Sequence, residues 1–161
     1  MENREKNLTL YYEAVRKDLD IVLTSTIPTQ KNLMKTIMWV NTSILGFIFT
    51  QLKSLPYVEW LIVSIGFSSF AIFLIVYSLK EGQIKYFGHS DLEQLESLES
   101  NRTEHIRGIA IMIDTVEQAY NNNIHIVQQR AKKLSGATTF TLFSFLNLSI
   151  YAGILANITL H

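Results

Sequence analysis

The most regularly spaced polar residues of the chain stand in an apolar run near its C-terminal end. Thr141, Ser144 and Asn147 are three residues apart, and Tyr151 follows four residues later. In an α-helix these four side chains share one face. Asn41 has a comparable position inside an earlier apolar run. Such groups either hydrogen-bond between membrane helices or line a water-filled path when several subunits assemble, and the sequence leaves both roles open.

Residue patterns for enzymatic chemistry are sparse. The chain has no cysteine, which excludes thiolate chemistry and Cys-ligated zinc, and its four histidines form no His-x-x-x-His pair. Arg102 and His105, within NRTEH, are spaced as in RNA-cleaving helical-pair nucleases, but two solvated residues at a helix start fit the same pattern. No P-loop, Gly-x-Gly-x-x-Gly or metal-ligand constellation is present in the sequence. We therefore expect neither an enzyme nor a metal site.

Three apolar runs have the length of a membrane-spanning helix, which is about 20 residues for a hydrocarbon core of about 30 Å. They cover residues 33–52, 57–79 and 137–160. Only KSLP separates the first two runs, so these helices are expected to form an antiparallel hairpin. The bilayer is thus the expected partner, whereas a formal net charge of zero gives no general attraction to nucleic acid.

The basic residues indicate how these spans are oriented. They stand before the first run and between the second and third runs, whereas the hairpin tip has only Lys53. By the positive-inside rule, the N-terminus and residues 80–136 are therefore expected on the cytoplasmic side, with the hairpin tip facing outward.

The cytoplasmic segments have helical periodicity. Residues 8–23 repeat apolar side chains at helical spacing, and TSTIPTQK is expected to break this helix before the membrane. Further along, Ser90 and Glu93 have the spacing of a capping box. They predict a short Leu-rich helix over residues 91–100.

A long helix is predicted after this short one. An apolar stripe of near-heptad spacing runs from Ile106 to Leu134, and the helix can continue through Gly136 into the third span, although Gly108 and YNNNIH weaken it. Part of the stripe has no partner within one chain, which favours a homo-oligomer. The expected fold is an all-α membrane protein with three transmembrane helices, a hairpin plus a C-terminal span, and a cytoplasmic helical stalk. It is expected to be a single domain with the segments 1–32, 33–79, 80–136 and 137–160.

Several features from Lys80 onward occur in the same order as in a known family. The second run leaves as SLKEGQIKYFG, the Leu-rich DLEQLESL follows, and VQQRAKKLSGATTFTLFSFLNL leads into the last run. This order resembles the Pycsar transmembrane effectors of bacterial antiphage defence, and it equally resembles other small two-span effectors linked to nucleotide signalling. The Phe-Gly exit turn of the Pycsar family corresponds to Phe87 and Gly88. Its Asp-x-Lys-Ala-like element before the first span is reduced to Lys31 in PTQKNLMK.

The resemblance implies an oligomeric effector of the bacterial inner membrane with a cytoplasmic N-terminus. Such an effector senses cCMP or cUMP and then forms a pore or disrupts the membrane, which causes growth arrest or cell death. The resemblance also makes Phe87 and Gly88 the expected coupling turn between the signal and the membrane helices. The alternative is a membrane scaffold or sensor subunit that recruits a soluble partner through its cytoplasmic helices, without a pore.

An anionic nucleotide requires cationic and aromatic side chains. Each available side chain, taken alone, also fits a solvated helix face. The candidates are Tyr86, Arg102, Arg107, Tyr120 and Arg130.

Overall fold

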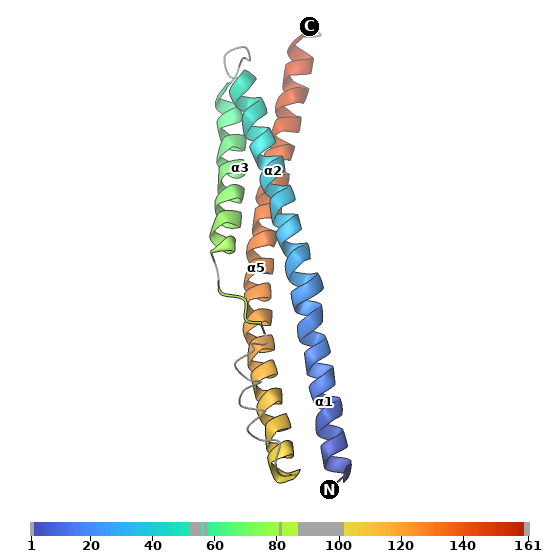
Figure 1. Cartoon of the computed structure of the whole chain (residues 1–161). Coiled ribbons are helices and arrows are strands. Elements are labelled where there is room, and N and C mark those ends of the chain that lie inside the picture. The colour runs from blue at the N-terminus through green and yellow to red at the C-terminus, as the bar shows by residue number, and fades with distance from the viewer. Residues whose placement is uncertain (1, 52–55, 57, 81, 87–101, 160–161) are drawn as a thin grey trace. The chain divides into compact units, whose positions relative to one another are not determined.

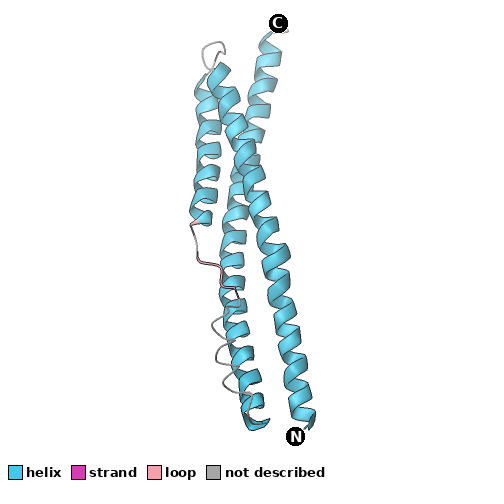
Figure 2. Cartoon of the chain, viewed as in Figure 1, coloured by secondary structure: helices cyan, strands magenta, loops and turns pink. Residues whose placement is uncertain are grey.

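The computed structural model describes residues 2–51, 56, 58–80, 82–86 and 102–159, and the described residues contain helices and no strand (Figure 2). The helical elements are α1 (Glu2–Ile21), the π-turn η1 (Val22–Thr26), α2 (Ile27–Gln51), α3 (Val58–Leu79) and α5 (Arg102–Thr159). Figure 1 labels α1, α2, α3 and α5. The chain divides into two compact units. Unit 1 holds residues Met1–Thr29 and Gly82–Gln128, and unit 2 holds Gln30–Glu81 and Gln129–His161.

The predicted all-α fold with three membrane-spanning helices is confirmed. Three helical stretches are long and apolar enough to cross a membrane, namely Arg4–Gln51, Val58–Leu79 and Ile106–Ile158. The chain is therefore a membrane protein by the length and composition of its helices. The homo-oligomer stays a prediction.

In unit 2, α2 and α3 run in opposite directions. Met34 and Ile37, early in α2, share a buried cluster with Ala71 and Ile75, which come late in α3. A second buried cluster joins the later part of α2 with the beginning of α3 and with α5; its members are Ile44, Ile48, Leu61 and Tyr151. The early part of α2 thus packs against the late part of α3, and the late part of α2 against the early part of α3, as expected for the predicted antiparallel hairpin. Helix α5 packs on this hairpin as a third helix.

The side chains of unit 2 are distributed in the way expected for a lipid environment. Small polar residues such as Ser64 and Ser68 are fully buried. Large apolar residues such as Trp39 and Leu142 are exposed to 69% and 63% of their surface. In water this distribution exposes much apolar surface, but in lipid small polar residues at helix interfaces permit close packing and hydrogen bonds.

In unit 1, α1 packs against the first part of α5. Leu19 is buried with Val116 and Ala119, and Tyr12 and Val15 pack on them. The C-terminal part of the apolar stripe predicted over residues 8–23 therefore packs against the first part of α5.

The expected break at TSTIPTQK is wrong, because the chain remains helical from α1 through η1 into α2. The Ile27 N–H donates to the carbonyl oxygen of Val22, five residues back. Pro28 is the reason for the expected break, since its ring clashes with the carbonyl four residues earlier in a regular helix. The wider π-turn relieves that clash, so the helix deforms instead of ending.

The long helix α5 is unbroken over 58 residues. Neither Gly136 nor the Asn-rich stretch YNNNIH interrupts it. A Cβ added at Gly136 would lie 3.3 Å from Leu74 Cδ1, so this glycine permits α3 and α5 to approach closely. The helix predicted at 91–100 and the coupling turn at Phe87 and Gly88 lie outside the described residues.

Candidate functional site

The polar face predicted on the third span points into the membrane bundle. Asn147 of α5 donates through its side-chain amide to the Ser64 hydroxyl and to the carbonyl oxygen of Trp60, both at 2.9 Å. Both acceptors belong to α3. The bonds place an amide inside the bundle, where only 9% of the Asn147 surface is exposed.

One helical turn earlier, serines pair α5 with α3 in both directions. The Ser144 hydroxyl donates to the Ser64 carbonyl oxygen at 3.1 Å, and the Ser64 hydroxyl is 3.3 Å from the Ser144 carbonyl oxygen. The hydroxyls of Ser68 and Ser144 also share a hydrogen bond at 2.8 Å. Because serine side chains are short, these bonds require the two backbones to be close together.

Asn41 connects α2 to the same polar face. Its amide nitrogen donates to the Thr141 hydroxyl and to the Ile37 carbonyl oxygen, each at 2.8 Å. Its Oδ1 atom is buried and accepts no hydrogen bond from the described residues. A buried acceptor without a donor is unfavourable in lipid. Asn41 is therefore the least satisfied group of the polar face.

Tyr151 completes the polar face near the hairpin tip, where its hydroxyl donates to the Pro56 carbonyl oxygen at 2.6 Å. The structure thus brings together all the residues predicted for the polar strip, and each forms a hydrogen bond to another helix or to the hairpin tip of the same chain. We call this set the polar strip; its members are Asn41, Thr141, Ser144, Asn147 and Tyr151. In the described arrangement it joins the helices of one bundle.

Cationic and aromatic side chains mark one end of the spans. The Lys133 ammonium lies 4.0 Å from the centre of the Tyr77 ring, a cation–π contact between α5 and α3. Tyr77 also stacks with Phe73, at 6.2 Å between ring centres. Such pairs are typical of the boundary between hydrocarbon and headgroups.

The residues predicted for an anionic ligand are distributed over both units of the chain. Tyr86 is 70% exposed and Arg107 is exposed, both in unit 1. Arg107 and Tyr120 are about 20 Å apart along α5, since a helix rises about 1.5 Å per residue. Arg130 belongs to unit 2 and is 4% exposed. Arg102 begins α5, and its side chain lies outside the described residues.

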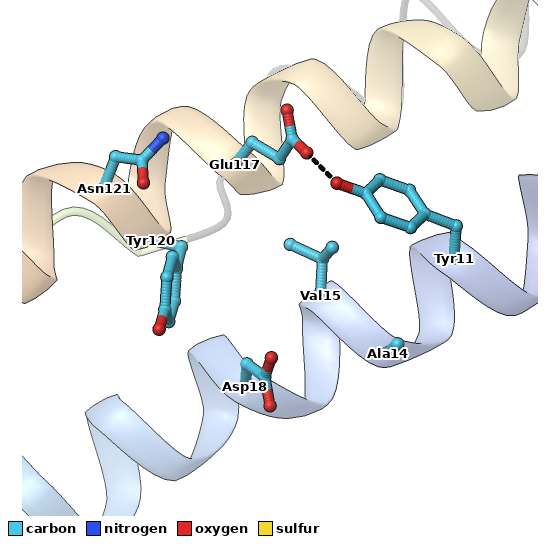
Figure 3. A pocket seen from close by; sticks show the side chains of 7 residues that line it. All are labelled: Tyr11, Ala14, Val15, Asp18, Glu117, Tyr120 and Asn121. Carbon is cyan, nitrogen blue, oxygen red and sulfur yellow. Dashed lines mark hydrogen bonds between the residues drawn. The ribbon is translucent and has the colours of Figure 1, made fainter.

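Tyr120 lies at a pocket of about 410 Å³ between α1 and α5 in unit 1 (Figure 3). Across this pocket the Tyr11 hydroxyl donates to the carboxylate of Glu117, a bond that raises the pKa of Tyr11. The pocket residues are Tyr11, Ala14, Val15, Asp18, Glu117, Tyr120 and Asn121. Two of them carry carboxylates and none is basic, so the charge of the pocket opposes a phosphate group.

No protein-family model, no curated protein and no solved structure matches the chain.

Sequence reasoning missed the partners of the polar strip and one buried amide elsewhere. Ser64 and Ser68 are four residues apart in the second span, and that spacing is the signal that places them on one face of α3. In unit 1, Asn123 is completely buried and bonds to the backbone of Lys85. Its sequence signal is ambiguous, because Asn in a helix is usually unfavourable.

Proposed function

We propose that the chain is a membrane effector in which an event at the cytoplasmic helices changes the packing of the membrane helices and makes the bilayer leak. The observation that carries the proposal is the continuity of α5. This one helix supplies Val116 and Ala119 to the core of unit 1 and Ser144 and Asn147 to the polar strip of unit 2.

The energetics of the polar strip suit a switch. Hydrogen bonds between membrane helices contribute about 0.6 kcal/mol each on average, with a maximum of about 1.7 kcal/mol. A bundle held by a few such bonds can therefore be rearranged by a modest cytoplasmic input. The buried Asn41 Oδ1 atom, which accepts no bond from the described residues, favours admission of water or of a donor from another copy.

In this proposal the described bundle is the closed state. On activation, the polar strip exchanges its bonds within the chain for bonds to water or to neighbouring copies, so that a homo-oligomer opens a polar path. Because α5 is one helix, a change in the packing of unit 1 acts on the same element that bears the strip.

The proposed input is cCMP or cUMP, and the proposed location is the bacterial inner membrane with the N-terminus in the cytoplasm. The resemblance from Lys80 onward supports the input, and the distribution of basic residues supports the orientation. The acidic pocket of unit 1 favours a nucleotide site elsewhere in the chain or between copies.

The test uses the full chain in liposomes that are loaded with a fluorescent dye. We expect cCMP or cUMP to release the dye. The variant Ser144→Ala with Asn147→Leu should abolish release, because it removes the bonding side-chain groups of two strip residues that join α5 to α3. A matched control is Phe143→Leu with Phe145→Leu, two exposed positions of the same helix, which should release dye normally. Release by the strip variant at the wild-type rate would show that the strip is not the path.

A second function is favoured by the hydrogen bonds that every residue of the polar strip makes within one chain. A bundle whose strip residues all have partners can remain closed permanently, and the cytoplasmic helices then serve as a scaffold for a soluble partner. The exposed side chains of Leu10 and Tyr86 in unit 1 fit such a role. If liposomes that contain the wild type and liposomes that contain the strip variant both retain their dye after addition of cCMP or cUMP, the scaffold function is favoured.

A further inference from the structure

The segment Gly82–Tyr86, which follows α3 after two residues, is attached to α5 at successive points within unit 1. The main attachment is Asn123, whose side-chain amide bonds both backbone groups of one residue. The Lys85 N–H donates to Asn123 Oδ1 at 2.9 Å, and Asn123 Nδ2 donates to the Lys85 carbonyl oxygen at 2.7 Å. A carboxamide thus supplies both backbone hydrogen bonds of Lys85, in a segment that forms neither helix nor strand.

Two further contacts hold the same segment. The side-chain amide of Asn122 donates to the Gln83 carbonyl oxygen at 3.2 Å. Gly82 has φ +69°, and a Cβ at this position would lie 2.6 Å from Ile126 Cδ1. The segment therefore approaches α5 so closely that a side chain at residue 82 has no room.

The segment also reaches the π-turn of the first helix. Ile84 packs on a buried cluster formed by Val22, Ile27 and Val127. Val22 begins the π-turn, and π-turns within helices frequently occur at functional sites. One apolar cluster thus receives side chains from the π-turn, from α5 and from the segment after α3.

We propose that Gly82–Tyr86 is a latch that Asn123 holds closed against α5, and that release of the latch frees the end of α3 and loosens the membrane bundle. The proposal rests on the proposed function and specifies how it is regulated. The physical basis is connectivity, because α3 ends at Leu79 and any movement of its end must pass into this segment. While Asn123 bonds Lys85, that movement is restrained.

The first measurement asks whether Asn123 holds the latch. In Asn123→Ala, hydrogen exchange at the Lys85 amide should become about tenfold faster, the factor that loss of one hydrogen bond produces. The matched control is Asn121→Ala, which changes helix propensity equally in the same Asn run but removes no latch contact. Equal exchange in the two variants would contradict the latch.

The second measurement asks whether the latch acts on the membrane bundle. Ser144→Cys places a thiol at a fully buried position in a chain that otherwise has no cysteine. A water-soluble methanethiosulfonate should label it about tenfold faster in the Asn123→Ala background than in the Asn121→Ala background, if one lost bond sets the difference. If the Lys85 amide exchanges faster in Asn123→Ala but the thiol is labelled at the same rate in both backgrounds, the proposal is overturned.

A third measurement keeps Asn123 and links the latch to α5 covalently, so that its result does not depend on whether Asn123→Ala folds. Gln83→Cys with Asn122→Cys can be joined by a short, reducible bis-methanethiosulfonate cross-linker, since the two residues are already in contact, and the cross-link can then be reduced in the same sample; the cross-linked sample is the oxidised form. Exchange of the last turn of α3 should be slower in the oxidised form, and identical exchange in both forms would contradict the latch. Neither exchange nor labelling depends on dye release, so the latch and the proposed function can fail separately.

Discussion

The side-chain amide of Asn41 donates to the hydroxyl of Thr141 at 2.8 Å, although a hundred residues separate the two in sequence. The bond joins the first membrane helix to the last one inside the bundle. The Thr141 hydroxyl in turn donates to the Ala137 carbonyl oxygen at 2.8 Å. The weak point of this arrangement is the buried Asn41 Oδ1 atom, which accepts nothing from the described residues.

Replacing Asn41 and Thr141 together should stabilise the closed bundle. The double variant Asn41→Leu with Thr141→Val removes the unsatisfied acceptor, and replacing both partners by apolar groups of similar shape is close to neutral or stabilising. We expect an equal or higher unfolding temperature in detergent, together with slower dye release. Thr36→Val is the control, because its exposed hydroxyl bonds only to its own helix, at Asn32. A lower unfolding temperature in the double variant alone would contradict this account.

Ser64 and Asn147 should be energetically coupled. Their bond at 2.9 Å predicts a coupling energy of about 0.6 kcal/mol, with an upper bound of about 1.7 kcal/mol, in a double-mutant cycle of Ser64→Ala and Asn147→Ala. The measurement is unfolding of the full chain in mixed micelles. Ser64→Ala combined with Thr139→Val serves as reference, since Thr139 is exposed and bonds to its own helix at Ser135. Additive effects in both cycles would show that the bond contributes nothing.

Gly82→Ala should destabilise unit 1, because residue 82 has a positive φ and Ile126 occupies the space of a Cβ. The backbone conformation alone costs about 1 to 2 kcal/mol for a residue other than glycine. The matched change is Gly46→Ala, at a helical position with nothing within 4 Å of the new Cβ, and it should be neutral or stabilising. Thermal unfolding of both variants checks the difference, and equal stability would exclude the close approach at residue 82.

The contribution of Tyr11 to stability should disappear in alkali. Its pKa is raised above the ordinary value of 10.0, first because its hydroxyl donates to Glu117 and second because the charge of Glu117 opposes deprotonation. A raised pKa in the folded state stabilises the fold at pH values below 10, and this stabilisation is lost as the pH rises through the folded pKa. Tyr11→Phe should therefore be less stable than the wild type at about pH 8, and the difference should narrow by about pH 11. A difference that is constant across this range would argue against the bond.

The sequence was sufficient for features that depend on local pattern. The spans follow from uninterrupted apolar runs, and the polar strip follows from the spacing of Thr141, Ser144 and Asn147, because a helix places such residues on one face. Their partners could not be predicted in this way. Ser64 can be recognised as a partner of the strip only once α3 and α5 are known to pack together. Asn123 bonds to Lys85, which is 38 residues away in the sequence.

The expected break before the membrane failed for a different reason. Pro28 is a reliable sign of strain in a regular helix, but a local rule does not say whether the chain ends the helix or widens one turn. Here the buried side chains of Val22 and Ile27, which pack in one cluster, favour the wider turn.

The π-turn Val22–Thr26 gives the first helix one residue more than its packing needs. Val22 and Ile27 are five residues apart and share a cluster. Deleting the exposed Thr24 would leave them four apart, which in an α-helix is again one face. The helix thus carries a spare residue ahead of its membrane span. That residue is a reserve of length with a fixed place: deleting it would restore regular helical spacing, and Pro28 would then face the carbonyl clash that the wide turn avoids.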